Sequence, residues 1–402
     1  MIWQMLKNQV TGSRLKLSDL AERVAGQPMF QLLQEAQALE RKGKHIIHFE
    51  LGDPDFDTPK NISNAAIRAI QEGHTHYAPS AGIHEFKLAI QETTLKSRNF
   101  KPTLPQILVT PGGNPVIFLA IACSANQGDE VIIPDPGFPT YFSAINACGA
   151  KAVSVQLHEK NNFELQAEDV INAITEKTKL IIINSPSNPT GACMDPHQIN
   201  LIAEYAITNN IYLLSDEIYS RLILGDEDFY SPGYIDECNK NIIILNGFSK
   251  AFAMTGWRLG VAIGPEKIIE KMNLMLNTIV SCVPPFIQYA GIEALEGDQS
   301  EIIKMRRKYQ KRRDIFVNGL NQVKGISCKM PRGAMYAFLN ITQTKLSSDQ
   351  FSQKCLHEAQ VAILPGNCFG IYGEGFARVT FANSSEKIQE GINRLKAIFG
   401  SK

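Results

Sequence analysis

The chain has 402 residues, 44% of them hydrophobic, and its 40 basic residues balance its 40 acidic ones, so the formal net charge is zero. A chain of this length can bury a large core and forms two domains more often than one. The balanced charge gives no reason to expect nucleic acid or an anionic membrane as a partner, and no run of about eighteen apolar residues predicts a membrane span.

Residues 1–19, which begin MIWQMLKNQVTGSRLKL, have neither a long apolar run nor a small-residue cleavage site, and we assign them no role. Further on, short apolar runs alternate with longer amphipathic segments. The runs rich in Val and Ile predict strands buried on both faces, at residues 105–110, 129–134, 151–157, 179–184, 211–216 and 241–246. The segments NPVIFLAIACSA and DPHQINLIAEYAITN predict covering helices. This alternation predicts an α/β fold with a mostly parallel central sheet covered by helices.

The pattern of predicted helices and strands changes beyond about residue 295. A basic helical stretch leads to AMYAFLNI, VAILP and FARVTFA, and the helix SSEKIQEGINRLKAIF closes the chain, which predicts a smaller α+β domain. We expect a large domain over 54–295 and a small domain made of 20–53 and 296–402. For the basic run KMRRKYQKRR we expect a solvated helix face or a dimer contact. Only Tyr309 could stack on bases there, so the run does not predict a nucleic-acid interface.

Polar and aromatic residues follow the predicted strands at their carboxyl ends, where open α/β sheets bind ligands. The stretch PGGN places Gly113 and Asn114 at a helix N-terminus, which favours an anion. In SPSNPTG, Asn188 precedes a proline, the bond type most able to be cis. The other side chains that follow strands are Phe138, Asp216, Tyr219 and Lys250.

Pyridoxal 5'-phosphate uses such a set, because it needs a lysine amine for its aldehyde, a carboxylate at its pyridinium nitrogen, and hydrogen-bond donors for its phenolate and phosphate. The motifs occur in the order FELGDPDFDTP, HYAPSAGIHEF, VTPGG, GDEVIIPDPGFPTY, SPSNPTG, SDEIY, FSKAFAMTGWRLG and ARVTFA. From about residue 45 to its end, the sequence resembles the fold-type I pyridoxal-phosphate-dependent aminotransferases of class I/II, the aspartate aminotransferase superfamily.

The resemblance implies the roles around the cofactor ring. Lys250 is expected to bind the aldehyde and to carry the substrate Cα proton, and Asp216 to hold the pyridinium proton. Tyr219 and Asn188 are expected to hydrogen-bond the phenolic oxygen. Phe138 is expected to stack on the ring.

The resemblance also implies the phosphate site. Ser249, Arg258 and the backbone at Gly113 and Asn114 are expected to bind the phosphate, and the planar fork of an arginine suits its oxygens. Tyr77, in HYAP, is similar to a tyrosine that reaches the phosphate of the neighbouring subunit. A homodimer with shared active sites is therefore implied.

For the substrate, the resemblance implies that Arg378 binds the α-carboxylate bidentately, assisted by Asn188, and that Gly52 lies in the loop closing over it. Many relatives specific for aspartate or prephenate have lysine where this chain has Asn114. Gly137 before Phe138 leaves more room at the rim than the residues often found there. Neutral and aromatic donors therefore remain open beside dicarboxylic ones.

The implied activity, in amino acid metabolism, is transfer of an amino group from an L-amino acid to a 2-oxo acid, with 2-oxoglutarate expected, in a ping-pong cycle. Two alternatives remain open: a pyridoxal-phosphate-dependent lyase or decarboxylase on the same fold, and a non-catalytic regulator that binds the cofactor. Product analysis separates them, because a lyase releases ammonia and pyruvate without a 2-oxo acceptor.

The eight cysteines are scattered without a CxxC pair, and no histidine cluster has the spacing of a zinc site. We therefore expect reduced thiols, a cytoplasmic location and no metal.

Overall fold

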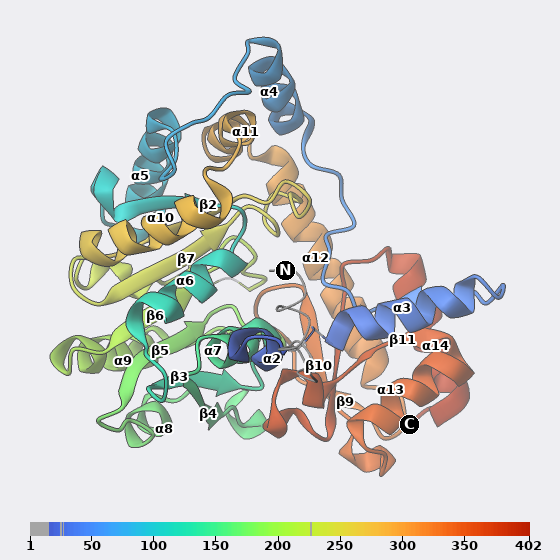
Figure 1. Ribbon diagram of the computed structural model, residues 1–402. Coiled ribbons are helices and arrows are strands. Elements are labelled where there is room, and N and C mark those ends of the chain that lie inside the picture. Colours follow the sequence, from blue (N-terminus) through green and yellow to red (C-terminus); the bar gives the residue numbers. More distant parts are fainter. Residues whose placement is uncertain (1–15, 25, 27, 226) are drawn as a thin grey trace, which may run out of the picture.

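The computed structural model describes residues 16–24, 26, 28–225 and 227–402. Their strands form a seven-stranded sheet, a four-stranded sheet and a two-stranded ribbon. The seven-stranded sheet and its helices make up one side of the molecule, and the chain's C-terminal third makes up the other (Figure 1).

The helices and strands are spread along the whole described chain. The helices are α2 (Asp19–Arg23), α3 (Pro28–Glu40), α4 (Lys60–Gln71), α5 (His84–Arg98), α6 (Asn114–Ser124), α7 (Pro139–Ala147), α8 (Ala167–Asn172), α9 (Pro196–Thr208), α10 (Glu266–Val280), α11 (Pro285–Glu296), α12 (Ser300–Leu320), α13 (Ser348–Lys354) and α14 (Ser385–Phe399). The strands are β1 (Ile47–His48), β2 (Ile107–Thr110), β3 (Glu130–Asp135), β4 (Lys151–Gln156), β5 (Thr178–Asn184), β6 (Tyr212–Asp216), β7 (Ile242–Gly247), β8 (Gly260–Ile263), β9 (Ser327–Cys328), β10 (Tyr336–Asn340), β11 (Val361–Ala362), β12 (Leu364–Pro365) and β13 (Phe376–Thr380). Within the part of the chain that the structure describes, no helix is long and apolar enough to cross a membrane.

The large sheet has the strand order β2-β8-β7-β6-β5-β3-β4. All six predicted strands are present in it, and the pairs from β7 to β4 run parallel. The prediction of a mostly parallel α/β sheet is confirmed. The strand β8 was not among the predicted strands; it begins at the last residue of the FSKAFAMTGWRLG segment and is antiparallel to both β2 and β7.

Helices cover both faces of this sheet, because alternate residues of each strand point to opposite sides. Ile181 and Ile183 of β5 share a core with α5, α9 and α11, whereas Leu180 and Ile182 share another with α6, α7 and α10. The predicted helices at 114–125 and 195–209 are α6 and α9. Every side chain of β3 and β2 is buried, as expected for strands inside a three-layer structure.

The smaller sheet is antiparallel, with the order β12-β13-β10-β9, and β1 pairs with β11. Its core is shared with α12, α13 and α14 (Figure 1). The segments AMYAFLNI and FARVTFA form β10 and β13, and the predicted closing helix is α14. The expected α+β character of this region is therefore present.

The basic run on α12 forms the expected solvated face except at its C-terminal end: exposed are Lys304, Arg306, Arg307, Lys308 and Lys311. Arg312 and Arg313 are each only 9% exposed. Arg312 donates to both carboxylate oxygens of Asp55 at 2.8 Å, and Arg313 donates to the carbonyl oxygens of Leu224 and Pro331. The expectation is wrong for these two residues, because they lie in the helix's buried stripe and bind loops that follow β1, β6 and β9.

Candidate active site

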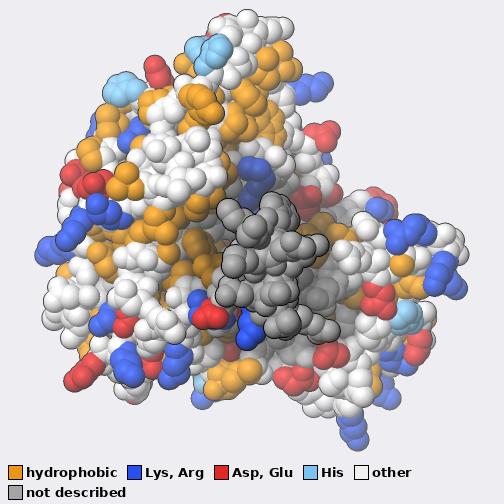
Figure 2. Space-filling model, viewed as in Figure 1, with side chains coloured by type: hydrophobic (Ala, Val, Ile, Leu, Met, Phe, Trp, Pro, Cys, Tyr) orange, Lys and Arg blue, Asp and Glu red, His pale blue; other side chains and the backbone are white. Residues whose placement is uncertain are grey.

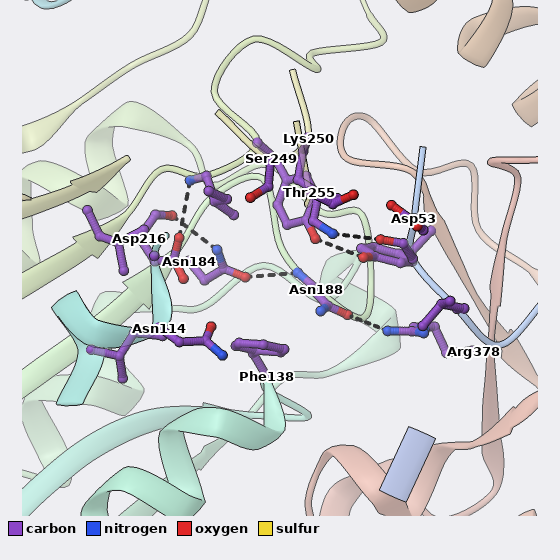
Figure 3. Close-up of a pocket in the computed structure, with 18 of the residues that line it drawn as sticks. Asp53, Asn114, Phe138, Asn184, Asn188, Asp216, Ser249, Lys250, Thr255 and Arg378 are labelled. Carbon is purple, nitrogen blue, oxygen red and sulfur yellow. Dashed lines mark hydrogen bonds between the residues drawn. The ribbon is translucent and has the colours of Figure 1, made fainter. Parts of the chain in front are cut away.

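A cavity of about 420 Å³ lies at the carboxyl ends of the large sheet's parallel strands, facing the small sheet (Figure 3). Its size is that of a cofactor site. All the predicted site residues except Tyr77 line it: Gly52, Gly113, Asn114, Phe138, Asn188, Asp216, Tyr219, Ser249, Lys250, Arg258 and Arg378. Residues more than 300 positions apart in sequence therefore meet in one cavity.

Lys250 lies on the loop that joins β7 to β8 and reaches across the cavity toward the segment after β1. Its Nζ donates to the carbonyl oxygen of Gly52 at 2.6 Å. Gly52 packs against Tyr336, and a Cβ on it would overlap the tyrosine ring. The predicted loop glycine is thus in contact with the predicted lysine, and only glycine fits there without moving Tyr336.

Asp216 ends β6 and is only 4% exposed. Its Oδ2 accepts from the Tyr141 hydroxyl at 2.6 Å and its Oδ1 from the Ile218 amide at 3.1 Å. Burial raises the pKa of Asp216 from 3.8 to about 6, although these two hydrogen bonds oppose the rise. Asp216 forms no ion pair with any described side chain, so this buried carboxylate has room for a cationic partner.

This raised pKa predicts how the cofactor-free protein responds to pH. An Asp whose folded pKa lies above its unfolded value stabilises the fold when protonated, so the stabilisation is complete below pH 3.8 and is lost as pH rises through 6. Asp216→Asn stays neutral throughout. Its free energy of unfolding relative to wild type, from urea titrations, is expected to increase by about 2 kcal/mol between pH 4 and pH 7.

The matched control is Asp169→Asn, which alters an exposed aspartate on α8. Its stability difference from wild type is expected to be small at both pH values. An Asp216→Asn difference that does not change with pH would contradict the raised pKa.

Tyr219 follows Asp216 by three residues and is also buried. Its hydroxyl shares a hydrogen bond of 2.8 Å with the hydroxyl of Tyr336, and the two rings meet edge to face. Burial, with the neighbouring Tyr336, raises the pKa of Tyr219 well above 10. It therefore acts as a neutral hydroxyl at ordinary pH.

A chain of hydrogen bonds connects the two ends of the cavity (Figure 3). Asn184 Nδ2 donates to the Asp216 carbonyl oxygen at 3.0 Å, and Asn184 Oδ1 accepts from the Asn188 amide at 2.8 Å. Asn188 Oδ1 then accepts from Arg378 Nη1 at 3.1 Å. This last bond orients the Asn188 side chain so that its Nδ2 is left to donate into the cavity. The bond between Asn188 and Pro189 is cis, an isomer that bonds before proline are the most able to adopt.

Arg378, on β13, is only 1% exposed although it is charged. Its Nη2 donates to the carbonyl oxygen of Glu50, and its guanidinium carbon lies 4.4 Å from the Tyr336 ring centre and 4.9 Å from that of Phe369. Its buried Nε has no hydrogen-bond partner among the residues that the structure describes. Burial lowers the pKa of Arg378. A buried guanidinium with an unused donor fits an anionic ligand.

Backbone amides and an arginine meet at the start of α6. Gly113 caps this helix and Asn114 is its first residue. Arg258 approaches from the β7–β8 loop so closely that a Cβ on Gly112, whose φ is +91°, would overlap the guanidinium. With Ser249 and Thr255 also lining the cavity, this corner fits a phosphate.

A loop from the small sheet's side is tied to the end of β3, beside Phe138. Asp135 is fully buried, and its carboxylate accepts from the amides of Ile371 and Tyr372 at 3.2 and 3.1 Å. Phe369, in the same loop, packs on Arg378. The anchoring by Asp135 therefore helps to place the wall around the arginine.

Tyr77 does not reach this cavity. It is 89% exposed on the segment between α4 and α5. The contact predicted for Tyr77 is with a neighbouring subunit. The structure describes a single chain, so this contact stays a prediction.

Several residues that shape the cavity were not predicted from the sequence: Asp53, Tyr141, Asn184, Thr255 and Tyr336. All five lie inside segments that had been recognised as motifs or strands. Membership of those segments was the one indication in the sequence that they could belong to the site. Their individual roles could not be predicted, because their partners are far away in sequence.

The chain is similar to known proteins over nearly its whole length. Residues 44–395 match the family model described as aminotransferase class I and II. The aspartate aminotransferase of Pyrococcus horikoshii is 41% identical over 92% of this chain and 94% of its own. The aromatic-amino-acid aminotransferase 2 of Thermococcus litoralis is 38% identical over 96% and 99%.

The similarity extends to solved structures. The crystal structure of the aspartate aminotransferase from Rhizobium meliloti has a TM-score of 0.91 to this chain at 32% identity, covering 96% of this chain and 98% of that one.

Proposed function

Because this chain belongs to the class I and II aminotransferases, enzymes of fold type I that use pyridoxal phosphate, we propose that it takes amino groups from donors with neutral, mainly apolar side chains. The reported relatives are aminotransferases by name, so transamination, and not the lyase or regulator alternative, is its activity. The observation that carries the donor proposal is the set of charges that line the cavity.

The residues at the cavity fit the cofactor. The buried carboxylate of Asp216 has no cationic partner within the described part of the chain, the corner at Gly113 and Arg258 offers donors to a phosphate, and Lys250 also lines the cavity. When bound, pyridoxal phosphate supplies an aldehyde carbon and a ring that takes up the electron pair of the substrate Cα–H bond.

We propose these roles for the chain's own groups. Lys250 would bind the cofactor and then move a proton at the substrate Cα. Asp216 would hold the proton on the pyridine nitrogen, which its burial makes a strong interaction. Tyr219 and the Nδ2 of Asn188 would donate to the phenolic oxygen, and Phe138 would lie on the ring face.

The remaining site residues would bind anions. Ser249, Arg258 and the helix start at Gly113 and Asn114 are proposed to hold the phosphate. Arg378 is proposed to bind the α-carboxylate of the donor. Its unused Nε and its contact with Asn188 support this role.

The donor proposal rests on whether any cation in the cavity lacks a proposed partner and could bind a second carboxylate. The cations that line the cavity are Lys250, Arg258 and Arg378, and each already has a proposed partner. The position at the start of α6 holds the neutral Asn114, beside Phe138 (Figure 3), and Asp53 adds a negative charge to the lining. A second carboxylate on the donor would therefore meet no spare cation among the described lining residues, whereas an apolar side chain can contact the hydrophobic wall.

A panel of single donors tests this proposal. With purified holoenzyme and 2-oxoglutarate as the proposed acceptor, kcat/KM for phenylalanine or leucine is expected to exceed that for aspartate by about tenfold or more. Replacing 2-oxoglutarate by pyruvate tests the acceptor.

Asn114→Lys supplies the missing cation and is expected to raise kcat/KM for aspartate, whereas Asn126→Lys adds the same charge at an exposed site and should not. Equal use of aspartate and phenylalanine by wild type would overturn the donor proposal.

We also propose a homodimer with shared active sites, in which Tyr77 reaches the partner's phosphate site. Its support is the exposure of Tyr77 and a group of exposed hydrophobic side chains on α4 and α10: Ile67, Ile70, Leu274, Ile279 and Val280. Figure 2 shows hydrophobic side chains gathered over the region where Figure 1 draws α4 and α11. Such a patch is typical of an interface. Light scattering should give twice the chain mass of 44.6 kDa.

The location and the domain division are also proposals. A cytoplasmic location is supported by the eight cysteines, which are all free thiols, several of them buried.

The division into a large domain, 54–295, and a small domain, 20–53 with 296–402, is supported by the positions of the strands. Those of the large sheet lie between 107 and 263, and those of the small sheet between 327 and 380. Limited proteolysis near residues 53 and 295 would test it.

A further inference from the structure

A second cavity, of about 580 Å³, shares no lining residue with the first. The segment after β6 separates the two, with Ile218 and Tyr219 lining the first cavity and Ser220 and Arg221 lining the second. The second cavity is formed by the C-terminal half of α5, by β7 and β8, and by the ends of two segments, residues 220–229 and 295–299. The helices α5 and α11 pack against each other, and both contribute lining residues. Nothing in the transamination chemistry uses this cavity.

Two arginines line the cavity, and one of them is fully neutralised. Arg98 Nε donates to Glu217 Oε2 at 2.6 Å, and both side chains are almost completely buried. Glu217 Oε1 accepts from Ser215 at 3.1 Å and from Ser231 at 2.5 Å. The Glu217 carboxylate is therefore occupied by one arginine and two hydroxyls, and it is not a partner of the second arginine.

The second arginine, Arg221, forms no ion pair with any carboxylate that the structure describes. Its guanidinium lies over the Phe252 ring at 5.1 Å, and its Nη1 makes one long hydrogen bond, of 3.4 Å, to Gln299 Oε1. Burial and the nearby charge of Arg98 lower the pKa of Arg221 to about 10. A partly buried cation beside another cation is costly unless an anion joins it.

A second unused donor faces the same cavity. Asn246 Oδ1 accepts from the Gly247 amide at 2.8 Å, which leaves its Nδ2 without a partner among the described residues. The walls also include the rings of Phe229, Phe248 and Phe252. Charged side chains line the cavity as well: Glu92, which pairs with Lys101, and also Lys96 and Glu296, and these three lining residues are exposed. The unmatched guanidinium and the unmatched amide, next to three aromatic rings, together suit a molecule with an oxyanion at one end and an apolar body.

We propose that this cavity binds a small organic anion, with its oxyanion on Arg221 and Asn246 and its apolar part against the phenylalanines. The oxyanion can be a carboxylate or a phosphate, because a guanidinium binds both in the same planar way. Arg221 comes two residues after Tyr219, and Asn246 is the last residue but one of β7, the strand that leads to Lys250, so the bound anion stabilises the segments that carry the catalytic groups.

The proposal is tested by calorimetric titration of the holoenzyme with two probes, benzoate and inorganic phosphate. Benzoate is expected to bind wild type at a site that Arg221→Met weakens at least tenfold, while any binding at Arg378 is the same in both proteins. Phosphate binding with the same dependence on Arg221 would identify a phosphate-type head group, and its failure would identify a carboxylate. Identical titrations of wild type and Arg221→Met with both probes would overturn the proposal.

Two further variants keep the test decisive. Arg221→Lys retains the charge and should retain part of the affinity, whereas Arg41→Met removes a charge from an exposed position and should change nothing. In buffer without either probe, the melting temperature of Arg221→Met should equal or exceed that of wild type, because an unpaired charge is gone. A marked fall would mean that Arg221 stabilises the fold directly, and this too would overturn the proposal.

Discussion

Replacing Lys250 by alanine is expected to abolish the visible absorbance of the lysine-bound cofactor and to lower the transamination rate by about 10⁴-fold. The amine both anchors the cofactor and moves the substrate proton, and positioned proton transfer contributes about 10² to 10⁴ in rate. The side chain projects into the cavity and makes one hydrogen bond, to Gly52, so the fold should survive its loss. Absorbance spectra and turnover with the best donor of the panel measure both effects.

Two comparisons separate catalysis from general damage. Lys240→Ala changes an exposed lysine and should leave spectrum and rate unaltered. Added methylamine can enter the space that Lys250→Ala leaves, so it should restore part of the proton transfer without restoring the covalent anchor. Persistence of the visible band in Lys250→Ala would refute the assignment.

Replacing Arg378 by lysine is expected to lower kcat/KM for amino acid donors by about 10²- to 10³-fold, mainly through KM. A lysine keeps the charge but loses the planar fork, and breaking a buried, hydrogen-bonded charge pair costs about 2–5 kcal/mol. The variant also loses the donor that holds Asn188 Oδ1 at 3.1 Å. Steady-state kinetics with the best donor measures this loss.

The control is a primary amine that has the donor's side chain but no carboxylate. Its slow reaction should be nearly equal in wild type and Arg378→Lys, because the arginine has nothing to bind. If the amine loses as much activity as the amino acid, then Arg378 acts on the architecture of the site and not on the α-carboxylate.

Much of the fold could be predicted because strands buried on both faces have a strong local signature. The Val- and Ile-rich runs at 179–184 and 241–246 are β5 and β7 within one residue. Parallel strands end at a common edge, so the residues after them had to meet, and Asn188, Asp216 and Lys250 do line one cavity.

The features that escaped prediction depend on partners far away in sequence. Tyr141 and Tyr336 look like ordinary core aromatics until the fold brings them to Asp216 and Tyr219. Arg312 was expected in solvent, as most helix arginines are, because its partner Asp55 lies 257 residues away. The strand β8 was missed since its four residues, GVAI, follow a polar motif and run against the direction of their neighbours.

That reversed strand has a consequence for ligand exchange. Because β8 returns alongside β7, the loop that carries Ser249, Lys250 and Arg258 is held at both ends by a hydrogen-bonded strand pair, Asn246 to Val261 and Gly247 to Gly260. The conformational entropy of closing this loop is lost when the chain folds, before any cofactor arrives. The apoenzyme should therefore keep the loop in place and reload with cofactor without a refolding step.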